Sequence, residues 1–172
     1  MLDRVKSKLA GWKANLLSMA GSAVLIQASS SAIPTYIMQS NLLPGKVLDG
    51  IDRVNINFLW GSTKNKGKMH WVGWRKVTRP KDEGGLGLQT AKGRNTTLLA
   101  KLNWRFHTED KVPWAKVLRM KYCNPQRLNS RNASKLPSSR IWKGILRGEE
   151  NFKKGIRWLL GFESNLEFWN DN

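Results

Sequence analysis

The sequence predicts a mainly α-helical protein with a few short β-strands, an α+β fold. Apolar residues recur every three or four positions over most of its 172 residues, which is the spacing of helices with one buried face. Short stretches rich in Trp and Val, such as residues 69–77, alternate instead with a period of two. Hydrophobic residues make up 40% of the chain, which is enough to build a core.

The first predicted helix begins at residue 2 and turns one apolar stripe toward the core. The stripe consists of Leu2, Val5, Leu9, Trp12, Leu16, Ala20 and Val24. Basic residues, namely Arg4, Lys6, Lys8 and Lys13, form its outer face. The same pattern is typical of a mitochondrial presequence, which stays open as the alternative. A core-facing helix is the simpler account, because burying each large apolar side chain stabilises a fold by about 1.5–3 kcal/mol.

No charged residue occurs between Ala14 and Gly45, a stretch long enough in principle to cross a bilayer. Six Ser and Gln side chains between residues 18 and 31, together with Pro34, argue against a membrane span. Pro34 is expected to break the helix. We therefore predict a buried pair of helices here and no membrane partner.

The next predicted helix starts at Pro44, whose missing N–H is not needed in a first turn, and stops at Gly61. Residues 62–68 are polar and cationic and separate this helical part from the Trp-rich segment after it. Residues 70–77 fit short strands or an extended segment better than a helix. Residues 80–87 form a loop, whose glycines indicate a tight turn rather than a phosphate-binding loop, since the Lys-Ser/Thr of a P-loop is missing.

The rest of the chain contains three further predicted helices and one loop. One helix is marked by apolar residues at 98–106, and the next follows Pro113. Residues 123–138 are loop-like and form an internal boundary. A helix capped by Ser138 or Ser139 then ends near Gly148, and two short strands are predicted within residues 156–160 and 166–169.

The charge of the chain points to nucleic acid as its partner. Thirty basic residues stand against twelve acidic ones, a net charge of +18 that a compact protein tolerates best beside a polyanion. Residues 61–108 carry eleven basic and two acidic groups, more excess charge per residue than the segments on either side. RNA, DNA or an RNA–DNA hybrid is therefore the expected partner.

Candidate contact residues follow from this concentration of charge. The densest group of basic residues lies beside two tryptophans, and aromatic rings next to cations can stack on unpaired bases at about 1–3 kcal/mol each. Most of the nine tryptophans are expected in the core, so one or two at most are expected to touch nucleic acid. The predicted interface comprises Lys64, Lys66, Lys68, Trp71, Trp74, Arg75, Lys76, Arg79, Lys81, Lys101 and Arg105.

No catalytic, metal or cofactor site is expected. The acidic residues occur mainly as adjacent pairs, such as Asp82 and Glu83, whose side chains point apart and do not form a two-metal site. Cys123, His70 and His107 are too few for a zinc site, and a single cysteine excludes a disulfide within the chain. Neither histidine lies in a hydrolase signature. A small-molecule substrate is not expected, and a reducing compartment, nucleus or cytoplasm, fits best.

Several phrases along the chain, in this order, resemble one protein family. They are LSMAG at 17–21, IPTYIM at 33–38, NFLWG at 57–61, HWVGW at 70–74, PKDEGGLG at 80–87, NTTLLAKLNWR at 95–105, GIRW at 155–158 and FWND at 168–171. Together they are similar to the region after the polymerase palm in plant LINE-type (non-long-terminal-repeat) retrotransposon reverse transcriptases. Ser22 departs from the pattern, since relatives usually have Arg there.

The resemblance implies that the chain has three parts, none of which is catalytic by itself. Residues 1–61 correspond to a thumb-like helical segment, residues 62–122 to a basic, Trp-rich connecting segment, and residues 123–172 to a helix and short strands that lead to a zinc-binding region. In full-length relatives the palm is an RNA-directed DNA polymerase, and a ribonuclease H-like domain often follows. The Tyr-x-Asp-Asp signature of a palm is absent from this sequence. We therefore expect a non-catalytic nucleic-acid-binding segment; the alternatives are a decayed reading frame or an accessory part that acts with a separate palm.

Overall fold

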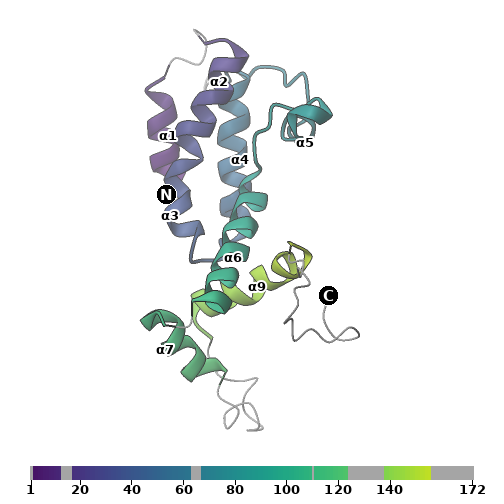
Figure 1. Ribbon diagram of the computed structural model, residues 1–172. Coiled ribbons are helices and arrows are strands. Elements are labelled where there is room, and N and C mark those ends of the chain that lie inside the picture. Colours follow the sequence, from purple (N-terminus) through teal and green to yellow (C-terminus); the bar gives the residue numbers. More distant parts are fainter. Residues whose placement is uncertain (1, 13–16, 63–66, 110, 124–137, 156–172) are drawn as a thin grey trace.

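The computed structural model describes residues 2–12, 17–62, 67–109, 111–123 and 138–155, and this part of the chain is helical (Figure 1). Helices α1, α2, α3 and α4 lie side by side at one end, and α6 leads from them to α9 and α7 at the other end. The described residues contain no β-strand, so the short strands predicted at 70–77 are wrong: residues 70–73 are irregular and residues 74–77 form a helical turn. The strands predicted within 156–160 and 166–169, and most of the loop at 123–138, lie outside the described residues.

The first helix is shorter than its apolar pattern suggested. Helix α1 (Leu2–Ala10) buries Val5 and Leu9, but it ends before Trp12, which is 48% exposed. A new helix, α2 (Met19–Leu25), begins after Ser18, whose hydroxyl accepts a hydrogen bond from the Gly21 N–H at 3.1 Å. The prediction of one continuous core-facing stripe is therefore wrong, because a helix cap intervenes and leaves Val24 exposed as well.

The helical path continues through Pro34, where a break was predicted. After α2 the chain widens into one π-helical turn, η2 (Ile26–Ser30), and then forms α3 (Ala32–Met38). The Ser31 N–H bonds to the carbonyl of Ile26 at 3.0 Å, five residues back. Pro34 sits in the first turn of α3, where its missing N–H removes no required hydrogen bond. The chain thus accommodates this proline by changing the helix type just before it.

Helix α4 (Gly45–Leu59) begins and ends where the sequence predicted. Pro44 precedes it and accepts hydrogen bonds from Val47 and Leu48, and Gly61 follows it with a φ of 64°, the left-handed conformation that favours glycine after a helix. Its apolar face enters a core shared with α1, η2 and α5 (Trp74–Val77). The buried residues of this core are Val5, Leu9, Ile26, Phe58, Leu59, Val77 and Leu88.

Helix α6 (Ala91–Thr108) connects the two ends of the molecule. Its first residue, Ala91, packs with Met38, Leu48 and Ile51 of α3 and α4. Its last turn places Phe106 against Ala115 of α7 (Pro113–Tyr122) and Ile145 of α9 (Arg140–Gly155). An α-helix of this length spans about 27 Å, so α6 is a member of two cores that do not touch each other directly.

Buried amide side chains fix the helices relative to one another. Asn95 of α6 donates to the carbonyls of Met38 and Asn41, each at 3.0 Å, and accepts from the Leu43 N–H at 3.1 Å. It therefore satisfies three backbone groups of the turn between α3 and α4. Asn103, further along α6, donates to the Ile145 carbonyl of α9 at 3.0 Å. Buried polar groups of this kind cost stability unless they are paired, so the hydrogen bonds of Asn95 and of the Asn103 Nδ2 favour one alignment of α6, although Oδ1 of Asn103 has no partner among the described residues.

Helix α9 crosses α6 at very close range and runs past its predicted end. It begins after Ser139, whose hydroxyl accepts from the Trp142 N–H at 3.2 Å, as predicted. Gly148 does not end it. A Cβ atom at Gly148 would lie 2.3 Å from the Leu99 carbonyl oxygen, and one at Gly144 would lie 2.9 Å from a Leu99 methyl group. These glycines let the two backbones approach, so the predicted stop at Gly148 is wrong and the helix continues to Gly155.

Candidate nucleic-acid interface

The region around α5 divides its tryptophans between the core and the surface. Trp74 and Val77 lie three residues apart on one side of this single turn and pack against the core, while Trp60 stacks on His70 with ring centroids 6.4 Å apart. Trp71, in contrast, is 79% exposed. Of the two tryptophans predicted to touch nucleic acid, only Trp71 therefore presents its ring to solvent, and Trp74 anchors the segment.

Five basic side chains near Trp71 in the sequence are exposed on the same segment. Together with Trp71 they form what we call the α5 basic surface: Lys68, Trp71, Arg75, Lys76, Arg79 and Lys81, all exposed. Within the described residues, Arg75, Lys76, Arg79 and Lys81 form no ion pair, although Asp82 and Glu83 follow directly. Met69 and Val72 are exposed beside Trp71, so this surface combines cations with apolar contact area.

A glycine-rich turn holds two of these cations in place. After the short 3-10 helix η3 (Lys81–Glu83), Gly84 and Gly87 adopt φ values of 78° and 67°. The chain then folds back so closely that a Cβ atom at Gly85 would lie 2.0 Å from the Arg79 carbonyl oxygen, which accepts from the Gly87 N–H at 3.0 Å. Residues 80–87 are thus the tight turn predicted from the sequence, and the turn displays Arg79 and Lys81 outward.

Beneath the α5 basic surface, Asp52 joins α4 to the start of α6. Its Oδ1 accepts from the Ala91 N–H at 2.9 Å, a backbone donor in the first turn of α6. Burial raises the pKa of the Asp52 carboxyl above its usual value, and nearby Asp49 adds to the rise. The Ala91 N–H and the Trp74 indole oppose that rise in pKa, although the indole N–H is not aligned for a hydrogen bond.

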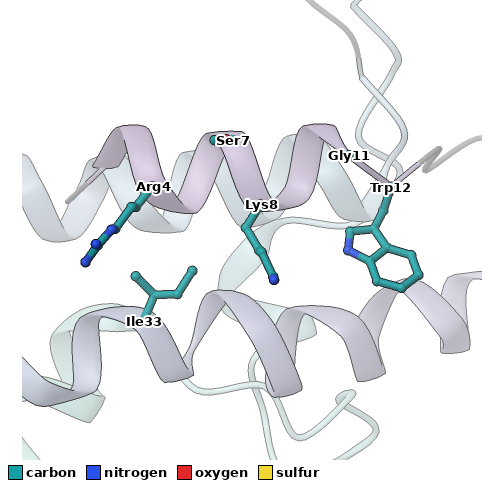
Figure 2. A pocket seen from close by; sticks show the side chains of 6 residues that line it. All are labelled: Arg4, Ser7, Lys8, Gly11, Trp12 and Ile33. Carbon is teal, nitrogen blue, oxygen red and sulfur yellow. The ribbon is translucent and has the colours of Figure 1, made fainter.

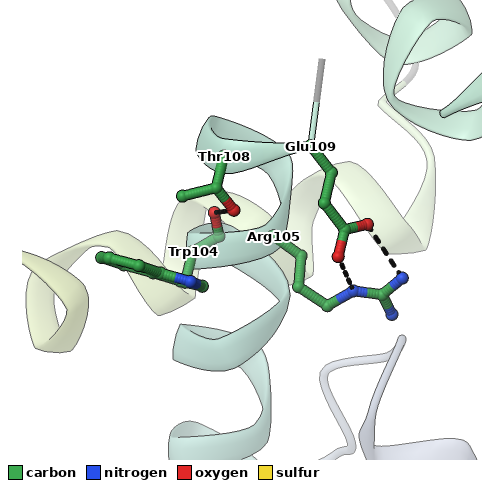
Figure 3. Close-up of polar contacts among 4 residues, drawn as sticks. All are labelled: Trp104, Arg105, Thr108 and Glu109. Carbon is green, nitrogen blue, oxygen red and sulfur yellow. Dashed lines mark hydrogen bonds and ion pairs between the residues drawn. The ribbon is translucent and has the colours of Figure 1, made fainter. Parts of the chain in front are cut away.

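The remaining predicted contact residues are dispersed. Lys101 is exposed in the second half of α6. Arg105 lies near the far end of α6, where its Nε and Nη2 donate to the two carboxylate oxygens of Glu109 at 2.9 and 3.0 Å (Figure 3). This pairing raises the pKa of Arg105, and its guanidinium also lies 5.8 Å from the Trp114 ring centroid. Lys64 and Lys66 lie outside the described residues.

A second cationic feature, absent from the predicted interface, lies between α1 and α3. An open groove of about 650 Å³ is lined by Arg4, Ser7, Lys8, Gly11, Trp12 and Ile33 (Figure 2). Arg4 and Lys8 are four residues apart on α1, which places them on one face of that helix, and Trp12 follows just after the helix ends. The sequence contained this signal, but Trp12 was assigned to the apolar stripe, since it also continues the spacing of Val5 and Leu9.

The described residues hold no group of three or more His, Cys, Asp or Glu side chains that is arranged to bind a metal ion. Among the same residues, no helix combines the length and hydropathy needed to cross a bilayer.

Comparison with known proteins shows that the chain is similar in sequence to two proteins of Arabidopsis thaliana. It is 38% identical to one named "Putative ribonuclease H protein", over 99% of this chain but only 28% of that protein's length. It is 28% identical to an "Uncharacterized mitochondrial protein", over 81% of this chain and 91% of that protein. The chain therefore spans less than a third of the first relative. No protein-family model and no solved structure matches it.

Proposed function

We propose that this chain is a retroelement-derived, non-catalytic segment that binds the backbone of RNA or of an RNA–DNA hybrid through the α5 basic surface. The observation that carries the proposal is the concentration of exposed cations around exposed Trp71 on a segment anchored by Trp74 and the glycine turn. Fixed cations aimed at solvent attract phosphates and release counterions when they bind them. DNA is the alternative nucleic acid.

The lineage of the segment is also part of the proposal. The name of the longer Arabidopsis relative contains ribonuclease H, and this chain aligns with 28% of it, which agrees with an origin as one part of a larger retroelement protein. The sequence phrases from LSMAG to FWND favour a non-long-terminal-repeat reverse transcriptase and a thumb-like role for its first helices. On this view polymerase and ribonuclease H activity belong to other parts of such proteins, and a separate polymerase palm is a candidate partner. We place the protein in the nucleus or cytoplasm, with the mitochondrion as the alternative.

The proposal is tested by titrating labelled single-stranded RNA, duplex DNA and an RNA–DNA hybrid with the full chain between about 50 and 200 mM salt. If all five cations of the α5 basic surface contact phosphates, affinity should fall by about 10²–10³ over this range, with little dependence on sequence. The triple variant Arg75→Gln, Lys76→Gln, Arg79→Gln should reduce the slope of log K against log salt by roughly 2 to 3, since each lost phosphate contact removes nearly one unit.

A matched control separates this surface from general attraction by net charge. The triple variant Lys116→Gln, Lys143→Gln, Lys154→Gln removes three exposed cations from α7 and α9, at the other end of the molecule (Figure 1). It should leave the slope almost unchanged. Equal slopes for the two triple variants would mean that binding is diffuse, and no measurable binding by the wild-type chain would refute the proposal.

A further inference from the structure

We propose that the groove between α1 and α3 is a second nucleic-acid site, one that holds a single strand with Arg4 and Lys8 on its phosphates and Trp12 stacked on an unpaired base. This site is separate from the α5 basic surface and shares no residue with it. It is built from Arg4 and Lys8, which share one face of α1, and from Trp12 just beyond the end of that helix, and all three line the same groove (Figure 2).

The two cations are available to a ligand. Arg4 and Lys8 are exposed, and neither forms an ion pair with an acidic side chain in the described residues. Residues four apart on a helix have their Cβ atoms about 5–6 Å from each other, so both charges face the same length of groove. Arg and Lys are hydrogen-bond donors only, and two of them side by side without a carboxylate favour an anion.

Trp12 gives the groove a second kind of contact at its end. Its backbone N–H bonds to the Leu9 carbonyl at 3.1 Å, which fixes the residue just after α1, while 48% of its surface is exposed. Gly11 beside it adds no side chain, so the space next to the ring stays open. A half-exposed indole that continues a row of cations offers a stacking platform for a base whose phosphates contact Arg4 and Lys8.

The shape of the groove favours a strand over a free nucleotide or a duplex. Sites for small molecules bury most of their ligand, whereas this groove is open along α1. Bases in a duplex are stacked on one another, so a ring such as that of Trp12 reaches the face of a base only in a single strand or at an end. The chemistry of the site, phosphate beside a planar base, is shared by a strand and a mononucleotide, and the test distinguishes them.

The test compares binding of a twelve-residue oligouridylate with binding of a blunt RNA–DNA hybrid to the full chain at about 100 mM salt. Trp12→Ala should weaken oligouridylate binding by about 5- to 150-fold, the fold-change that corresponds to the loss of one stacked base. It should change binding of the hybrid by less than about twofold, and Trp12→Phe, which keeps an aromatic ring, should restore most of the affinity. Thermal melts followed by circular dichroism at 222 nm verify that each variant is folded.

The charge contacts have a matched control on the same helix. Lys8→Gln and Lys6→Gln remove the same charge, but Lys6 points away from the groove because it lies two residues, about 200° around the helix, from Lys8. Lys8→Gln should weaken oligouridylate binding several-fold more than Lys6→Gln. Equal effects of these two variants, no effect of Trp12→Ala, or competition by uridine monophosphate as effective as that of the oligomer would each overturn the proposal. Each comparison is repeated in the Arg75→Gln, Lys76→Gln, Arg79→Gln background, so that this site and the α5 basic surface can fail separately.

Discussion

At the scale of single residues, Asp52 shows how one side chain serves both the fold and the candidate interface. It receives the first N–H of α6, and it lies beneath Trp74, which anchors the α5 basic surface. Desolvation raises its pKa, because the charged form loses water that one backbone donor only partly replaces. The carboxylate therefore holds two helices together at an electrostatic cost that depends on pH.

This cost predicts the direction of a pH dependence. The pKa of Asp52 is higher in the folded than in the unfolded state, so the folded state binds the proton more tightly. The benefit is complete below the unfolded value of about 4 and is lost as pH rises through the raised folded value. Relative to Asp52→Asn, which cannot ionise but keeps an oxygen for the Ala91 N–H, the wild type should become less stable between about pH 3 and pH 7. Urea unfolding of both proteins across this range measures the difference.

A second substitution makes the pH test more specific. Asp49→Asn removes the neighbouring negative charge that helps raise the pKa of Asp52, so it should shrink the pH-dependent difference without abolishing it. A wild type that gains stability relative to Asp52→Asn as pH rises would contradict the assigned direction.

At this scale the sequence indicates which residue types take part, but not whether each side chain faces the core or the solvent. Trp71 and Trp74 are three residues apart and equally flanked by cations, yet only the packing of Trp74 with Val77 decides which ring is exposed. Trp12 was assigned to the core because its spacing from Leu9 is correct for a helix, and the end of α1 at Ala10 is what releases it. Nothing local marked Asn95 as the partner of a turn more than fifty residues away.

At the scale of elements, most helix positions could be predicted because their signals are local. Pro44, Gly61, Pro113 and Ser139 mark helix ends as expected, and Ser139 caps its helix with a side-chain hydrogen bond. The prediction of short strands at 70–77 was wrong, because an alternating pattern of a few residues does not distinguish a strand from an irregular segment that leads into a single helical turn. The prediction that the helix stops at Gly148 was wrong for another reason. The role of Gly148 depends on its contact with α6, which is distant in the sequence.

The crossing of α6 and α9 yields a prediction about Gly148. Gly148→Ala places a methyl group 2.3 Å from the Leu99 carbonyl oxygen, a contact that the backbone must shift to relieve. We expect a loss of about 1–3 kcal/mol in the free energy of unfolding, the range for overpacked sites. Urea unfolding measures it, and Gly155→Ala is the matched control on the same helix, because no atom lies within 4 Å of the added Cβ. Equal stability of the two variants would mean that α6 and α9 do not pack this closely.

At the scale of the whole molecule, charge and architecture act against each other. A net charge of +18 is spread over helices with three small cores; α4 contributes to the first two, and α6 contributes to the second and the third. Self-repulsion of this size destabilises a compact state, and a bound polyanion or dissolved salt relieves it. The charge could be counted from the sequence, but its division into the α5 basic surface and the groove on α1 required the packing. The effect of salt also distinguishes a folded protein from a decayed reading frame, because a chain that no longer folds has no compact state for salt to stabilise.

Salt should therefore stabilise the full chain in the absence of any partner. We expect a cooperative thermal transition at 222 nm whose midpoint rises when NaCl is increased from about 10 to 150 mM, since screening reduces the repulsion of +18 charges. The triple variants at α5 and at α7 and α9 both lower the net charge by three, so both should show a smaller rise, and by similar amounts, because this effect belongs to the whole molecule. Their similarity here, against their difference in nucleic-acid binding, separates global repulsion from a local interface. A sloping, non-cooperative melt that salt does not change would instead favour the decayed reading frame.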